Sequence, residues 1–143
     1  MNSLKYPATR HSPASLPDLG RREERERLSA PGLKAFFNIM ALWEVKDEDA
    51  RALLGGVSNG PFYEMKRNPE RVLETDRLLR ISYLVGIFKA LRILHGASLA
   101  DEWIHLPNDN PIFAGQPPLT YLIRGGLPAL QVVRKLLDAR RAG

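Results

Sequence analysis

The segment 75–95 (TDRLLRISYLVGIFKALRILH) constrains the fold more than any other part of the chain. Thr75 begins a helical pattern that runs to His95, and Gly96 follows. Its apolar residues cover well over half of the helix circumference: Leu78, Leu79, Ile81, Leu84, Val85, Ile87, Phe88, Leu91, Ile93 and Leu94. A helix that is apolar on most sides must be covered on most sides. We therefore expect a central helix, buried in its own domain and also against a second chain.

Helical patterns account for the rest of the chain from Ser29 onward. Apolar spacing of three and four residues over 33–41 predicts a helix with Ser29 as its cap. Shorter helices are expected from Asp47 to Gly55-Gly56, from Ser58 to Asn68, from Ser98 to Pro107, from Pro118 to Gly125 and from Pro128 onward. Asp47, Ser58 and Ser98 are the cap candidates of the first three. No convincing strand pattern is present. The sequence predicts an all-α fold.

Composition shifts divide the chain into three segments. Residues 1–28 are expected to form a flexible N-terminal arm, because 1–20 are rich in Pro and Ser and the charge-dense 21–28 indicates a frayed lead-in. Residues 29–96 would hold a helix-turn-helix-like part and a dimerisation helix. Residues 97–143 would form a small C-terminal domain, with the long helix 75–95 joining the two.

Several protein classes are excluded by composition. The chain has 143 residues and no Cys, so disulfide scaffolds and thiolate sites are ruled out. No apolar run approaches the roughly 18 residues that span a bilayer, and no secretory signal is present. We expect a cytoplasmic protein. Its net charge of +5 permits an anionic partner without requiring one.

Catalysis has little support in the residue pattern. No phosphate loop, metal-ligand spacing or nucleophile motif is present. The carboxylates Asp47, Glu48 and Asp49 suit the positive end of a helix better than acid–base chemistry. We predict that the chain is not an enzyme and needs neither a metal nor a cofactor.

Residues 32–73 have the spacing of a helix-turn-helix. The third helix would be the recognition helix, and its candidate DNA-binding residues are Ser58, Asn59, Tyr63, Lys66 and Arg67. Two features oppose sequence-specific contact with DNA. Residues 32–74 hold six basic and seven acidic side chains, and Gly60-Pro61 narrows the reading face. A helical hairpin that only packs would show the same pattern.

The segment 103–126 carries a more specific pattern. Trp103-Ile104-x-x-Pro107-Asn108-x-x-Pro111-Ile112-Phe113-x-Gly115-x-x-Pro118-Leu119-x-x-Leu122-Ile123 precedes Gly125-Gly126, and Val132-Val133 lies in a closing helix. This order and spacing resembles the toxin-binding domain of Xre/MbcA/ParS-type antitoxins. The preceding helices resemble the degenerate Xre-like helix-turn-helix of that family, so the resemblance covers residues 32–141.

The resemblance implies an antitoxin of a type II toxin–antitoxin system. Its partner would be a RES-domain toxin that degrades NAD or uses it for ADP-ribosylation, and the antitoxin would occlude the toxin's active site. The resemblance also implies a homodimer or a larger hetero-oligomer, operator DNA as a partner, and repression of its own operon. Toxin-binding candidates that match the family are Asn108, Asp109, Asn110, Arg134, Arg140 and Arg141, while Trp103, Phe113 and Leu119 would support the fold. The alternative function is a stand-alone helix-turn-helix transcriptional regulator.

Overall fold

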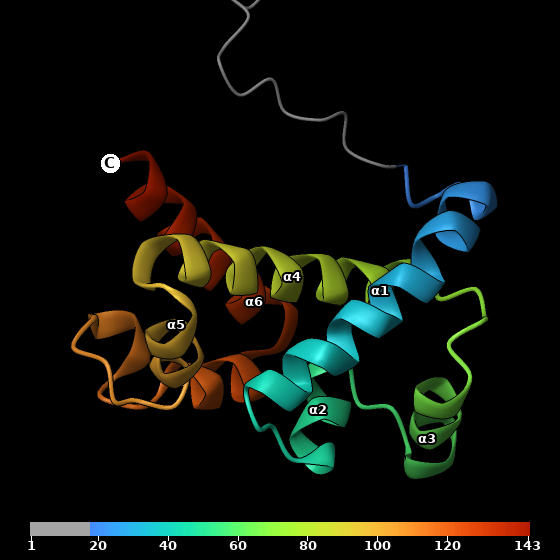
Figure 1. Cartoon of the computed structure of the whole chain (residues 1–143), viewed down its shortest axis with the longest axis horizontal. Coiled ribbons are helices and arrows are strands. Elements are labelled where there is room, and N and C mark those ends of the chain that lie inside the picture. Colours follow the sequence, from blue (N-terminus) through green and yellow to red (C-terminus); the bar gives the residue numbers. More distant parts are fainter. Residues whose placement is uncertain (1–17) are drawn as a thin grey trace, which may run out of the picture.

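The computed structural model describes residues 18–143, which are all-helical and contain no strand (Figure 1). The predicted all-α fold is therefore confirmed for this part of the chain. The elements in chain order are α1 (Arg22–Leu42), α2 (Asp47–Leu53), α3 (Asn59–Arg67), α4 (Thr75–His95), α5 (Ala97–Trp103), the 3₁₀ turn η1 (Pro111–Phe113) and α6 (Pro118–Ala142).

Helix α4 is the centre of the molecule and packs against α1, α5 and α6. In Figure 1 it runs across the middle, with α2 and α3 toward one end and α5 toward the other. Leu84, Ile87 and Leu91 are fully buried, and of its predicted apolar set only Ile93 is strongly exposed, at 64%. Packing within one chain therefore buries half of this apolar set and leaves Leu79, Val85, Phe88 and Leu94 partly exposed.

The start of α1 differs from the prediction. The helix begins at Arg22, so residues 22–28, expected to lie in the arm, form its first two turns. Residues 1–17 of that arm lie outside the described residues. Ser29 is not a cap but a buried residue inside the helix, where its hydroxyl donates to the Arg25 carbonyl. The same hydroxyl accepts the Leu73 backbone N–H at 2.8 Å, which ties α1 to the segment before α4.

Other helix boundaries agree with the sequence only in part. Helix α4 spans the predicted residues and is followed by Gly96, whose φ of 77° suits glycine. Asp47 is not the cap of α2, because Lys46 holds that position and Asp47 is the first helical residue. Ser98 likewise lies inside α5 and does not cap it.

The last helix contains the predicted break. Gly126 has φ 63° and ψ −146°, a non-helical conformation that divides α6 into two parts, and Pro128 follows inside the second part. Buried residues of the segments 29–96 and 97–143 belong to one hydrophobic cluster, which includes Leu33, Phe62, Leu84, Leu122 and Leu137. The two predicted segments thus share a core.

Candidate functional site

The residues that carry the antitoxin-like pattern hold together the turn between α5 and α6. Phe113 is 2% exposed, and the rings of Trp103 and Tyr121 pack edge-on against it at 5.9 and 5.3 Å between centroids. The Leu119 backbone N–H donates to the Ile104 carbonyl at 2.9 Å, which closes the turn. Trp103, Phe113 and Leu119 therefore support the fold.

Two of the candidate loop contacts are used inside the turn itself. The Asn108 side-chain oxygen accepts the Asn110 backbone N–H at 2.9 Å. The Asn110 side-chain oxygen accepts the Ile112 N–H at 3.1 Å and so caps η1. Asp109 lies between them and is exposed. The loop therefore offers a partner one exposed carboxylate on a backbone that its neighbours hold rigid.

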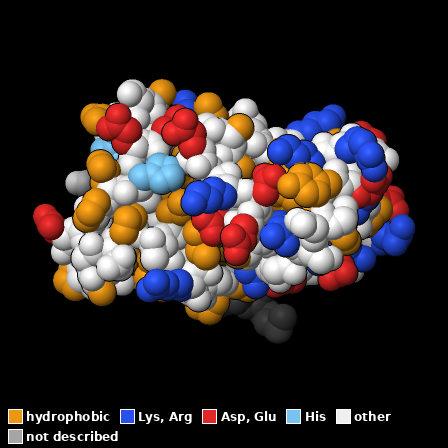
Figure 2. All heavy atoms as spheres, turned by 90° about the horizontal axis from the view of Figure 1, so that it is seen from below, with side chains coloured by type: hydrophobic (Ala, Val, Ile, Leu, Met, Phe, Trp, Pro, Cys, Tyr) orange, Lys and Arg blue, Asp and Glu red, His pale blue; other side chains and the backbone are white. Residues whose placement is uncertain are grey.

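The same turn exposes apolar side chains. Leu106 is 53% exposed and Ile112 is 36% exposed. Ile112 also lines a shallow groove of about 330 Å³ together with Tyr121 and Arg124. In Figure 2 the end of the molecule that holds this turn shows many hydrophobic side chains and few charged ones. Exposed apolar side chains on a well-packed turn are typical of protein contact surfaces.

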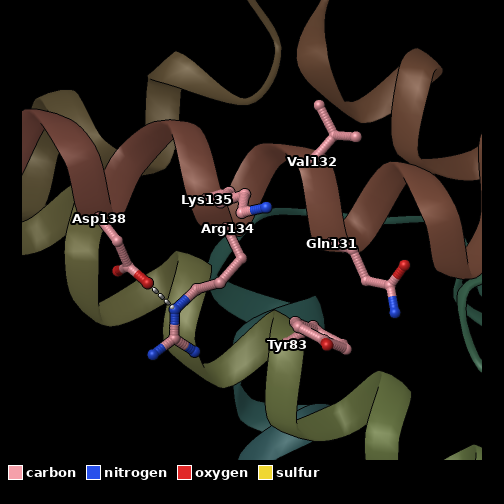
Figure 3. Close-up of a pocket in the computed structure, with 6 residues that line it drawn as sticks. All are labelled: Tyr83, Gln131, Val132, Arg134, Lys135 and Asp138. Atoms are coloured by element: carbon pink, nitrogen blue, oxygen red, sulfur yellow. Dashed lines mark hydrogen bonds and ion pairs between the residues drawn. The ribbon is translucent and has the colours of Figure 1, made fainter.

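Arg134 lies against the neighbouring helix instead of projecting freely. Its guanidinium covers Gly86 of α4, where an added Cβ would lie 1.4 Å from the arginine Nη1. Its Nε donates to Asp138 at 2.9 Å. Together with Tyr83 and Gln131 it lines a groove of about 520 Å³ between α4 and α6, as Figure 3 shows.

The six candidate toxin-binding residues do not form one surface. Arg140 and Arg141 are exposed in the last turn of α6, and Nη1 of Arg141 lies 4.0 Å from an Asp138 oxygen. In Figure 1 this end of α6 is well separated from the loop between α5 and α6. A partner that contacts both regions must therefore extend around the α5 end of the molecule.

All five candidate DNA-binding residues lie on or beside α3 and are exposed: Ser58, Asn59, Tyr63, Lys66 and Arg67. Ser58 stands at the N-cap position, but its hydroxyl makes no capping hydrogen bond. The hydroxyl of Ser58 and the amide of Asn59 are therefore available to an external partner at the start of the helix.

The other three candidates, Tyr63, Lys66 and Arg67, are each paired with a carboxylate. The Tyr63 hydroxyl donates to Oδ2 of Asp47 at 2.9 Å, and Lys66 Nζ lies 3.9 Å from Oδ1 of the same carboxylate. Arg67 pairs with Glu64 one turn earlier. Figure 2 shows Lys/Arg and Asp/Glu side chains interspersed at the end that holds α2 and α3. This surface is therefore of mixed charge, not a continuous basic patch.

These pairings also move two pKa values. The hydrogen bond from its hydroxyl to Asp47, and then the charge of that carboxylate, raise the pKa of Tyr63 above the ordinary tyrosine value. The hydrogen bond from Arg67, followed by its positive charge, lowers the pKa of Glu64. Both groups are solvent-exposed, so these shifts indicate local contacts and not large contributions to stability.

Sequence reasoning missed the parts that Asp47 and Gly86 play here. Asp47 was assigned to helix capping, and a carboxylate at a first helical residue offers no signal that its partners lie on the next helix. Gly86 lies inside a helical run of bulky residues, where glycine is unfavourable. A glycine at this position in the sequence could therefore have indicated that another group packs against the helix backbone at residue 86.

The described residues contain no group of three or more His, Asp or Glu that could hold a metal ion. Within residues 18–143 no helix is both long and apolar enough to cross a membrane.

Comparison with known proteins shows the family of this chain through one relative. The chain is similar to y4oB of Sinorhizobium fredii, whose name describes it as uncharacterized. The two are 37% identical over 112 residues, which cover 78% of this chain and 84% of y4oB. The chain belongs to the y4oB family. No family model and no solved structure matches it. The function of this y4oB-family chain must therefore be argued from its own surfaces.

Proposed function

We propose that the protein is the antitoxin of a type II toxin–antitoxin system and binds and occludes the active site of a RES-domain, NAD-dependent toxin. The observation that carries the proposal is the turn between α5 and α6. Its motif residues pack inward around Phe113, while Leu106 and Ile112 face solvent on a backbone fixed by Asn108 and Asn110. A rigid turn that displays apolar side chains supports a role in binding another protein.

The basic end of α6 would supply the electrostatic part of that contact. Arg140 and Arg141 are exposed, and the nearby Asp138 is already paired with Arg134. Guanidinium groups form paired hydrogen bonds with carboxylates, so acidic residues of the toxin are their natural partners. Arg134 contributes mainly by packing over Gly86.

The test is co-expression with the product of the open reading frame adjacent to its gene, which the proposal expects to be the toxin. We expect the wild-type chain to restore growth and the cellular NAD level and to co-purify with the toxin. The R140E/R141E variant should lose at least tenfold in affinity, because it places like charges against acidic partners. Arg134 stays unchanged in this variant so that the packing on α4 is kept.

The matched control is K34E/K46E, which makes the same change in net charge at exposed residues on other surfaces. It should neutralise the toxin as the wild type does. Equal loss in both variants would point to net charge and contradict the α6 contact. A toxin whose activity and mobility on a sizing column are unaffected by the wild-type chain would overturn the antitoxin role itself.

Operator binding and repression of its own operon are a further part of the proposal. The alternative is a stand-alone transcriptional regulator, and the observation in its favour is the exposed polar start of α3 at Ser58 and Asn59. A regulator of this kind would bind its operator tightly without a protein partner and with a steep dependence on salt. An antitoxin would bind the toxin whether or not DNA is present.

A further inference from the structure

The α2–α3 surface contains an internal competitor for DNA. Its cations are Lys46, Arg51, Lys66, Arg67 and Arg71. The Asp47 carboxylate of α2 reaches two groups of α3 at once. One of its oxygens accepts the Tyr63 hydroxyl at 2.9 Å, and the other lies 3.9 Å from Lys66 Nζ. Both are groups that bind phosphate oxygens when a helix of this kind lies on DNA.

We propose that Asp47 acts as an intramolecular clamp that lowers the affinity of α3 for the DNA backbone. The inference rests on the operator-binding part of the proposed function. A phosphate that approaches Lys66 must displace Asp47 or remain beside its negative charge, and either outcome weakens the contact.

The charges around Asp47 determine how much its carboxylate affects DNA binding. Arg51 and Arg71 have no carboxylate within 4.0 Å among the described residues, although each influences the electrostatics of a neighbour on α3. Lys66 is paired only with Asp47 in the same part of the chain. Removing the negative charge at position 47 therefore leaves Lys66 without a paired carboxylate, whereas removing one elsewhere on α2 leaves the Lys66 contact in place.

The experiment compares D47N with E48Q on the full chain. Each removes one negative charge from the first turn of α2, but of the two only Asp47 has a hydrogen bond or ion pair with α3. The probe is a short fluorescein-labelled DNA duplex of arbitrary sequence, and its anisotropy is followed from about 50 to 200 mM salt. The helical circular dichroism signal checks that each variant is folded.

We expect D47N to bind the duplex about two- to fivefold more tightly than the wild type, the size of an exposed ion pair. The slope of log binding constant against log salt concentration should become steeper by about one unit, which corresponds to one additional phosphate contact. E48Q should stay near the wild-type affinity at the higher salt, where charges about 8 Å apart are largely screened. In the K66Q background the D47N change should lose most of its effect.

Three results would overturn the clamp: equal strengthening by D47N and E48Q, an undiminished effect of D47N in the K66Q background, or no measurable binding by D47N. Toxin neutralisation is scored on the same variants and is expected to be unchanged. Failure of the clamp with intact neutralisation leaves the antitoxin proposal standing. Tighter DNA binding by D47N without any neutralisation would instead favour the stand-alone regulator.

Discussion

At the scale of single residues, Glu44 stores strain that can be released. It follows α1 with φ 52°, in the left-handed region, and it is exposed. Left-handed geometry costs a residue with a Cβ roughly 1–2 kcal/mol, and the greater freedom of glycine in the unfolded chain offsets part of the gain. We expect E44G to raise the free energy of unfolding by about 0.5–1 kcal/mol, measured by urea denaturation.

The control for Glu44 is K34G, which places glycine at an exposed position inside α1 and should lower stability by about 1 kcal/mol. If both glycine variants are destabilised alike, the strain at position 44 is not relieved by glycine and the prediction is wrong.

Tyr63 allows a prediction about pH. Asp47 raises its pKa above the ordinary value of about 10, so the protonated hydroxyl is the form favoured by the fold. The contact is therefore fully present below pH 10 and is lost as the pH rises through the raised value. In NMR spectra of ring-labelled tyrosine, the Tyr63 signal should titrate above that of an ordinary tyrosine. In D47N its pKa should fall back, and an unchanged Tyr63 titration in D47N would show that Asp47 is not the cause.

At the scale of elements, the break in α6 depends on one glycine. Gly126 adopts φ 63° and ψ −146°, which residues with a Cβ rarely reach, while a Cβ there would have only an ordinary contact with Arg80 at 3.9 Å. We expect G126A to cost about 1–3 kcal/mol through backbone strain alone. Thermal denaturation of G126A and of the control G32A measures this.

The control glycine lies in regular helix. A Cβ at Gly32 of α1 would make ordinary contacts, the nearest at 3.5 Å to Ile81, so G32A should gain about 0.5–1 kcal/mol from helix propensity. Destabilisation of G32A as large as that of G126A would mean that packing, not backbone geometry, controls both positions.

Helix positions followed from local pattern, but the starts of α1, α2 and α5 did not. Periodicity and glycine stops predicted α4 and the break at Gly126, because both depend on neighbouring residues. The sequence predicts Ser29 as a cap because serine at the edge of an apolar pattern usually is one. Its actual partner, the Leu73 N–H, is 44 residues away, and no local rule contains a contact of that range.

In the candidate site too, some features could be predicted from local sequence and others could not. The inward packing of Phe113 could be expected from the pattern. The pairing of Asp47 with Tyr63 and Lys66 could not, because it depends on how α2 and α3 are placed relative to each other. Charge counts over residues 32–74 indicated a balanced surface but could not say which cation met which carboxylate.

At the scale of the whole molecule, one core predicts one unfolding transition. Trp43 lies at the end of α1 and Trp103 at the end of α5, so each of the two tryptophans reports on a different predicted segment. Fluorescence of W43F and of W103F should change at the same urea concentration as the circular dichroism of the same variant. A Trp103 signal that changes separately from the helical signal in W43F would show that residues 97–143 unfold as an independent domain.

The packing of Arg134 over Gly86 also constrains the order in which this protein could have changed during descent. An alanine at 86 would collide with the guanidinium, so it requires either a shorter side chain at 134 or an Arg134 side chain that leaves this pose. Once residue 86 carries a Cβ, an arginine at 134 can no longer adopt the pose seen here, because its guanidinium would overlap that Cβ. Relatives that carry a Cβ at position 86 should therefore have a shorter side chain at 134 or an arginine that turns away from α4, whereas glycine at 86 accepts either.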